Sequence, residues 1–354
     1  MKKTLLAAAL LAGFAGAAHA QSSVTLYGIV DVGIGGDSNG GNGITGGDGD
    51  SQYGMLSGVQ SGSRWGLRGS EDLGNGLRAN FQLESGFDVT NGRSLQGSRL
   101  FGRQAWAGLS GAWGEVRAGR QVTVAADYFA FTDPFGTGFG AAGAQNTFSS
   151  NATNRVDNTI AYFSPSFSGF QAGVGYSFNQ TGGVAHSDDQ NNLVSVGLKY
   201  ANGPLAAALT YDRAILGEDT LWHADTDGHD PYSVQLGGSW DFNVVKAYAA
   251  ASYTKHGYVT DATFVAPGEN IKSYLVGLSA PVGAGSLFGS WQHSNYSGDV
   301  GPNGDDKRNI YSVGYTYNMS KRTNLYAYYA YSDTAFFDED WDRSSYAVGL
   351  RHRF

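Results

Sequence analysis

Apolar and polar residues alternate with a period of two along most of the chain. From Val24 to Val32 every even position holds Val, Leu or Gly, while Thr25, Tyr27 and Asp31 share the odd positions. Residues 77–84 repeat the pattern with the polar residues at even positions. This period is typical of β-strands that expose two different faces. The chain is therefore predicted to be all-β.

The connections between these strands are systematically unequal. Short turns alternate with long polar loops to the end of the chain, and eight such alternations predict sixteen strands. The short turns lie near residues 71–76, 111–114, 164–169, 201–204, 241–244, 281–285 and 318–323, and the long loops at 36–58, 90–99, 122–156, 180–191, 214–231, 257–269, 297–307 and 334–343. Outer-membrane barrels have short periplasmic turns and long external loops. The pattern indicates a sixteen-stranded antiparallel transmembrane β-barrel.

Alternation alone does not say which face points outward, but the aromatic residues help to decide. Tyr and Phe gather near strand ends, as at Tyr162, Tyr176, Tyr315 and Tyr331. Aromatic girdles at the two membrane interfaces have this placement. The alternative is aromatic packing in a soluble sandwich, but this many strands exceeds the usual size of such folds.

Residues 122–156 interrupt the alternation. The segment is rich in Gly, Ala and Phe, which suits packing against other parts of the protein better than solvation. Connections of this length are uncommon unless they are functional or disordered. We expect 122–156 to fold into the barrel as a constriction loop.

Residues 1–20 match a cleaved secretory signal peptide: Lys2 and Lys3 precede an apolar run, and Ala18-His19-Ala20 forms a cleavage site. Residues 21–354 then form one barrel domain, exported after cleavage near Ala20. Without Lys2 and Lys3, 21 basic residues stand against 31 acidic ones, a net charge of −10. This balance disfavours nucleic acid as a partner. The chain has no Cys, so it forms no disulfide.

Several segments resemble the general porins of the Gram-negative outer membrane. These are SSVTLYGIVDVGI at 22–34, SRWGLRGSEDLGNGLRANFQLESGF at 63–87, RQAWAGLSGAWGEVRAGRQ at 103–121 and the terminal SYAVGLRHRF. The resemblance covers the mature chain. It implies a homotrimer in outer-membrane lipid and lipopolysaccharide that conducts small hydrophilic solutes and ions by passive diffusion. It also implies insertion by the barrel-assembly machinery, with Phe354 as the terminal signal.

The resemblance further implies a constriction, or eyelet, with acidic groups on the loop facing arginines on the wall. The family often has Pro-Glu-Phe-Gly on the loop, whereas this chain has Asp133-Pro134-Phe135-Gly136, so the acidic residue precedes the proline. The candidates are Asp127 and Asp133 on the loop, and Arg64, Arg78, Arg103 and Arg155 on the wall, with Arg68 and Arg120 as further wall positions. Such a field orients polar solutes in a narrow opening. The acidic net charge favours cations at the mouths and the arginines favour anions at the eyelet, so the selectivity stays open.

Other motifs do not change this interpretation. The GxGxxG match at 41–46 lacks a flanking strand and helix, so no dinucleotide cofactor is expected. The acidic run at 225–230 lacks the spacing of a calcium loop, and the histidines lack a metal-ligand spacing. The two alternative functions are a barrel enzyme using His186, Asp188 and Asp189 at the external rim, and an adhesin or receptor acting through the loops. An enzyme is disfavoured because no catalytic constellation is evident.

Overall fold

The computed structural model describes residues 23–38, 51–148, 155–180, 191–217, 229–257, 269–297, 306–336 and 339–354. The predicted signal peptide, the GxGxxG match and the rim residues His186, Asp188 and Asp189 lie outside these ranges. None of the helices in the described ranges has the length and apolar character of a membrane-spanning helix.

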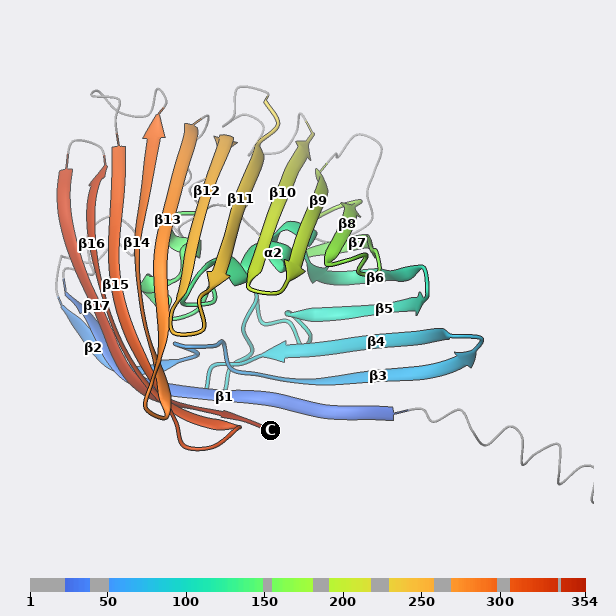
Figure 1. Cartoon of the computed structure of the whole chain (residues 1–354), viewed down its shortest axis with the longest axis horizontal. Helices are drawn as coiled ribbons and strands as arrows, with labels where there is room; N and C mark the ends of the chain where they lie inside the picture. The colour runs from blue at the N-terminus through green and yellow to red at the C-terminus, as the bar shows by residue number, and fades with distance from the viewer. Residues whose placement is uncertain are drawn as a thin grey trace, which may run out of the picture.

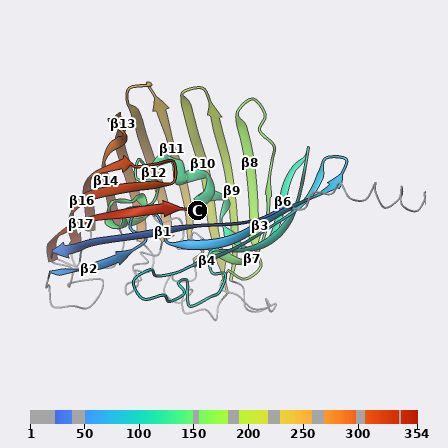
Figure 2. The same cartoon turned by 90° about the horizontal axis from the view of Figure 1, so that it is seen from below.

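The described residues form one antiparallel sheet of seventeen strand segments that closes on itself (Figures 1 and 2). The segments are β1 (Ser23–Ser38), β2 (Gln52–Ser57), β3 (Arg64–Gly74), β4 (Leu77–Gly86), β5 (Gln104–Gly111), β6 (Gly114–Val122), β7 (Arg155–Phe163), β8 (Phe170–Ser177), β9 (Asn191–Asn202), β10 (Leu205–Leu216), β11 (Tyr232–Asp241), β12 (Lys246–Gly257), β13 (Glu269–Val282), β14 (Gly285–Ser297), β15 (Asp306–Asn318), β16 (Thr323–Phe336) and β17 (Glu339–Arg353). Both β2 and β3 pair with β1, so they are two parts of one barrel strand. The barrel therefore has the sixteen strands that the sequence predicts.

The ends of the chain close the barrel. β1 pairs with β17 in a register that sets Ile29 opposite Arg353. Beyond this pair, Gly28 and Phe354 exchange two backbone hydrogen bonds of 3.1 Å. Closure matters in lipid because it leaves no sheet edge with unpaired backbone groups.

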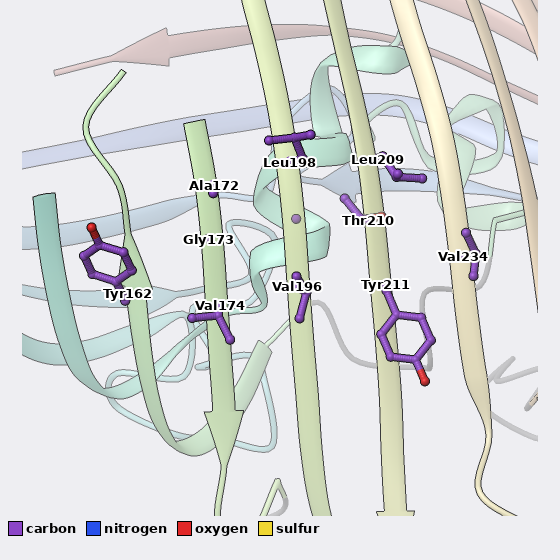
Figure 3. A pocket seen from close by; sticks show the side chains of 11 residues that line it. Tyr162, Ala172, Gly173, Val174, Val196, Leu198, Leu209, Thr210, Tyr211 and Val234 are labelled. Carbon is purple, nitrogen blue, oxygen red and sulfur yellow. The ribbon is translucent and has the colours of Figure 1, made fainter. Parts of the chain in front are cut away.

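The two faces of the wall differ in chemistry, and the apolar face points outward. Val196, Leu198 and Leu209 are 41 to 47% exposed, whereas the alternate residues Ser195 and Thr210 are 1% exposed. Figure 3 views this outer surface over β8 to β11, with helix α2 (Val124–Phe129) behind the strands. An apolar outer band over a polar interior is the arrangement of a membrane barrel.

Tight turns form the short connections between the strands. The β3–β4 turn places Gly74, Asn75 and Gly76 at φ values of 86°, 54° and 77°. Positive φ is easily adopted by Gly and tolerated by Asn, so this local sequence specifies the turn.

The wall differs from the sequence prediction in two of the long loops. Residues 52–57, inside the predicted loop 36–58, form strand β2 because they pair with β1. Residues 334–336 and 339–343, inside the predicted loop 334–343, extend β16 and β17, which pair with each other there. Between β2 and β3, residues 58–63 leave the wall. Asp31, which is fully buried, holds this break: its Oδ2 accepts from the Ser61 N–H at 2.7 Å, and its Oδ1 accepts from the Tyr326 hydroxyl at 2.7 Å.

Candidate channel constriction

Residues 123–148, here called the inner segment, connect β6 towards β7 across the inward-facing side of the wall. The segment begins with α2, whose N-terminus is capped by the Thr123 hydroxyl accepting from the Ala126 N–H at 3.1 Å. Short 3-10 turns follow: η2 (Ala130–Thr132), η3 (Gly140–Ala142) and η4 (Ala144–Asn146). α2 contacts β8, β9, β10 and β11 (Figure 1).

Inward-facing glycines give the inner segment its place. A Cβ atom added at Gly173 would lie 2.7 Å from Val124, and one added at Gly197 would lie 2.8 Å from Tyr128. The same holds farther along the segment, at Gly237 against Thr132 and at Gly277 against Pro134. A distance below 3 Å is a steric clash. The missing side chains therefore form a track for the segment on β8, β9, β11 and β13.

We expect Gly197→Ala to displace α2 from this track, because the new methyl group would collide with the ring of Tyr128. Overpacking of this kind typically costs about 1–3 kcal/mol. The temperature at which the folded barrel loses its fast gel mobility should fall, and single-channel currents should become noisier. Gly54→Ala is the matched control, since an added Cβ there has nothing within 4 Å. Equal behaviour of the two variants would argue against the track.

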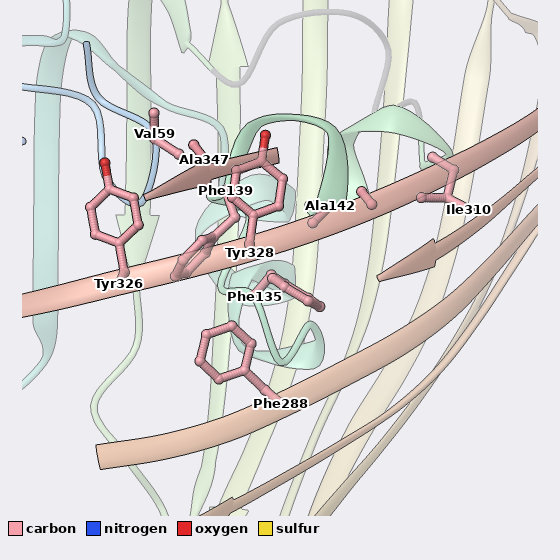
Figure 4. Close-up of a cluster of buried hydrophobic side chains, with 10 residues drawn as sticks. Val59, Phe135, Phe139, Ala142, Phe288, Ile310, Tyr326, Tyr328 and Ala347 are labelled. Atoms are coloured by element: carbon pink, nitrogen blue, oxygen red, sulfur yellow. The ribbon is translucent and has the colours of Figure 1, made fainter. Parts of the chain in front are cut away.

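An aromatic cluster holds the middle of the inner segment against β14 and β16 (Figure 4). Phe135 and Phe139 lie 4.9 and 5.2 Å from Phe288 between ring centroids. Phe139 also lies 5.7 Å from Tyr326 and 5.9 Å from Tyr328, both edge-on. Edge-to-face pairs at these distances are favourable beyond the area that they bury.

Polar contacts hold the end of the inner segment. The Thr147 hydroxyl donates to Gln292 Oε1 at 2.7 Å, and Gln292 Nε2 donates to the Ala142 carbonyl at 2.7 Å. Arg308 Nη1 donates to the Asn146 carbonyl at 3.1 Å. Both wall residues are buried, so each contact satisfies a group that would otherwise lose water. The segment is thus fixed along its length.

The wall of β3 to β7 carries a group of arginines at the level where the inner segment begins. Arg103 Nε donates to Glu84 Oε1 at 2.7 Å, and Arg64 Nη1 lies 3.9 Å from the same oxygen. A Cβ added at Gly62 would lie 3.3 Å from Arg103 Nη1 and 3.9 Å from Arg64 Nη2. Arg64 and Arg103 therefore converge on one carboxylate beside the β2–β3 break.

A second carboxylate serves the neighbouring arginines. Asp157 Oδ1 accepts from Arg120 Nη1 at 2.7 Å and from Arg99 Nη1 at 2.8 Å. Arg155 lies close enough to Arg64, Arg103 and Arg120 to experience electrostatic repulsion from their guanidinium groups. We call this set of seven charged residues the arginine wall: Arg64, Arg99, Arg103, Arg120, Arg155, Glu84 and Asp157. With five guanidinium groups and two carboxylates, these seven residues have a net charge of +3.

The remaining predicted site residues lie elsewhere. Arg78 shares the inward parity of Glu84, but it lies next to the β3–β4 turn, where the strand register sets it opposite Asp72. Its Nε donates to the Ser70 hydroxyl at 3.1 Å. The structure therefore does not bring Arg78 into the arginine wall. Asp127 is exposed in the first turn of α2.

Asp133 is inside the inner segment and does not face water. It is 3% exposed, and its carboxylate accepts from the N–H groups of Phe135, Thr137 and Ala144 at 2.8 to 3.0 Å. Burial raises the pKa of Asp133, while the three backbone hydrogen bonds act in the opposite direction. Its contacts are those of a residue that shapes the loop, which corrects the expectation that it lines an opening.

Glu84, Asp157 and Arg99 are not among the residues predicted from the sequence, although the structure places all three in the arginine wall. Glu84 occupies one of the even, polar positions of residues 77–84, and that parity is the one signal that could have found it. Asp157 and Arg99 meet across 58 residues of sequence, so no local pattern reports their contact. Arg120, a further wall position in the sequence analysis, joins through the same carboxylate.

Together these features define a class of protein: a closed membrane β-barrel whose polar interior is partly filled by a fixed inner segment beside a cationic wall. The family model described as Gram-negative porin matches residues 7–335, and the chain belongs to this family. It is an outer-membrane channel for the passive diffusion of small hydrophilic solutes and ions.

Individual relatives agree with this assignment. An outer membrane porin protein of Bordetella pertussis is 48% identical over the full length of both chains. Outer membrane porin protein 32 of Delftia acidovorans is 36% identical, over 94% of this chain and 89% of that protein. Among solved structures, an anion-selective porin from Comamonas acidovorans matches with a TM-score of 0.75 and 29% identity, over 94% of this chain and 100% of that one.

Proposed function

We propose that solutes pass between the inner segment and the arginine wall, and that this passage prefers anions. The observation that carries the proposal is the charge of the wall, where five guanidinium groups outnumber two carboxylates. Positive groups around a narrow aqueous opening raise the local concentration of anions. In this proposal, residues 122–156 are the constriction loop of a barrel domain spanning 21–354.

The described part of the inner segment supplies little charge of the opposite sign. Of its two acidic residues, Asp127 is exposed, while Asp133 is bound by three backbone N–H groups within the segment. The inner segment therefore exposes one carboxylate, whereas the arginine wall has a net charge of +3. The similar porin from Comamonas acidovorans is described as anion-selective, which supports the same preference here.

Exchanging the conducted ions tests this proposal. Replacing chloride by glutamate, a larger anion, is expected to lower the single-channel conductance far more than replacing potassium by a bulky organic cation. The reason is that anions carry most of the current through an opening with excess positive charge. A conductance that followed the cation instead would refute the anion preference.

The partners implied by the resemblance belong to this proposal as well. We infer a homotrimer in outer-membrane lipid and lipopolysaccharide, exported after cleavage near Ala20. Phe354 is our candidate signal for the barrel-assembly machinery; its backbone is hydrogen-bonded to Gly28, and the residue is 45% exposed. We expect no catalytic activity, because diffusion through a pore requires no chemistry. An adhesin or receptor role of the loops is compatible with the pore.

A further inference from the structure

On the side of the arginine wall that is nearer the β3–β4 turn, a hollow of about 370 Å³ lies against the inner faces of β1, β3, β4, β5 and β6. Its lining includes Arg68, Gln82, Trp106, Glu115 and Arg117. Arg68 is four residues closer to the β3–β4 turn than Arg64, which corresponds to roughly 13 Å along a strand. The hollow is therefore a separate place on the short-turn side of the wall.

Arg68 offers a charge to this hollow. Its guanidinium carbon lies 5.2 Å from the centroid of the Tyr27 ring. The side chain is exposed, and within the described ranges no carboxylate forms an ion pair with it. Contact with the ring fixes a guanidinium without neutralising it. The charge remains available to an anion.

Arg117 is a second cation of the hollow, and its charge is balanced by Glu115. It lies between the rings of Trp106 and Phe163, at 4.7 and 4.5 Å from their centroids. Its Nε and Nη2 both donate to Glu115 Oε2, at 3.0 and 2.6 Å. The pair adds no net charge, but it presents a cation and a carboxylate that can accept from a hydroxyl group.

Tyr27 connects the hollow with the arginine wall. Its hydroxyl donates to Glu84 Oε2 at 2.9 Å and accepts from Gln82 Nε2 at 2.6 Å, while its ring supports Arg68. One residue thus positions groups of both places. An anion leaving Arg68 would next meet the guanidinium groups around Glu84.

We propose that this hollow is a binding site for small hydroxycarboxylates on the short-turn side of the channel. The carboxylate binds Arg68, and the hydroxyl groups bind Glu115 and the neighbouring amides. Arg68, Arg117 and Glu115 together carry one net positive charge, which suits a monoanion. The inference extends the proposed anion preference to a ligand class and a second location, and it does not require that the arginine wall sets the selectivity.

Block of the potassium chloride current by gluconate tests the site. Gluconate is added to each compartment of a planar bilayer in turn, and the apparent dissociation constant is read from the dose dependence. We expect stronger block from one side, because the site lies off the middle of the channel. Arg68→Gln should weaken that block about tenfold, the value of one charge-assisted hydrogen bond. The matched control Arg322→Gln removes a cation near a short turn outside the hollow and should leave the block unchanged.

The outcomes separate the two proposals. Equal block in Arg68→Gln, Arg322→Gln and the unmodified channel would overturn the hydroxycarboxylate site, whatever the ion preference. Weaker block in Arg68→Gln alone supports the site, even if the unmodified channel proves to prefer cations and the arginine-wall proposal fails. Both variants must first show a folded, heat-modifiable barrel, so that a loss of block reports on the site.

Discussion

Replacing Arg64 and Arg103 together by serine is expected to move the channel's preference from anions towards cations. The two substitutions lower the net charge of the arginine wall from +3 to +1, and they remove the two ion-pair partners that Glu84 has within the described ranges. The attraction between a permeating anion and one guanidinium group a few ångströms away is worth roughly 1–4 kcal/mol at the dielectric of a wet protein surface. Each substitution removes one such attraction. The expected shift of the zero-current potential in a potassium chloride gradient is therefore large.

Two controls make this result specific to the wall. Arg78→Ser with Arg322→Ser removes the same charge from residues outside the arginine wall, and should shift the potential only slightly. Glu84→Gln with Arg103→Ser disrupts the same contact but keeps the net charge, so the preference should stay near that of the unmodified channel. If the Arg78 and Arg322 pair shifted the potential as much as the Arg64 and Arg103 pair, a local role of the wall would be untenable.

Deleting residues 130–142 is expected to raise the single-channel conductance by roughly a factor of two or more, because the narrowest part of a pore limits its current. The deletion removes Phe135 and Phe139 from the aromatic cluster on β14 and β16. The deletion joins Phe129 to Gly143, and Phe129 belongs to the same buried cluster as Ala144, next to the junction. The wall itself is unchanged.

A variant of full length separates loop volume from loop anchoring. Phe135→Leu with Phe139→Leu weakens the cluster but keeps the backbone of the inner segment. We expect it to lower the unfolding temperature and to change the conductance less than the deletion does. An unchanged conductance in a folded deletion variant would mean that residues 130–142 do not limit the opening.

Most of the fold could be predicted from the sequence, because the strands and turns of a barrel wall are specified by residues that are close together in the sequence. Period-two alternation specifies which side chains face out, and turns such as Gly74-Asn75-Gly76 specify where strands reverse. The break between β2 and β3 could not be predicted, because it depends on Asp31 and Tyr326, which are 295 residues apart. The glycine track is equally non-local, since Gly197 has meaning only beside Tyr128.

The candidate site was predictable only in part, because parity gives the side of a strand and not the height along the barrel. Arg64 and Arg78 both face inward, yet Arg64 is opposite Gly86 and Arg78 is opposite Asp72 near the turn. Asp133 precedes the proline of its motif, whereas the acidic residue of the family motif follows the proline. Its three hydrogen bonds to the backbone of the inner segment could not be predicted from the residue type. Ion pairs such as Arg120 with Asp157 require the folded wall.

The proposed anion preference is tested most directly by the zero-current potential of the unmodified channel in a planar bilayer with a potassium chloride gradient. We predict a potential of the sign given by chloride moving down its gradient faster than potassium, because the arginine wall carries excess positive charge. A potential of the opposite sign would contradict the proposed anion preference and would place the control of permeation outside the arginine wall.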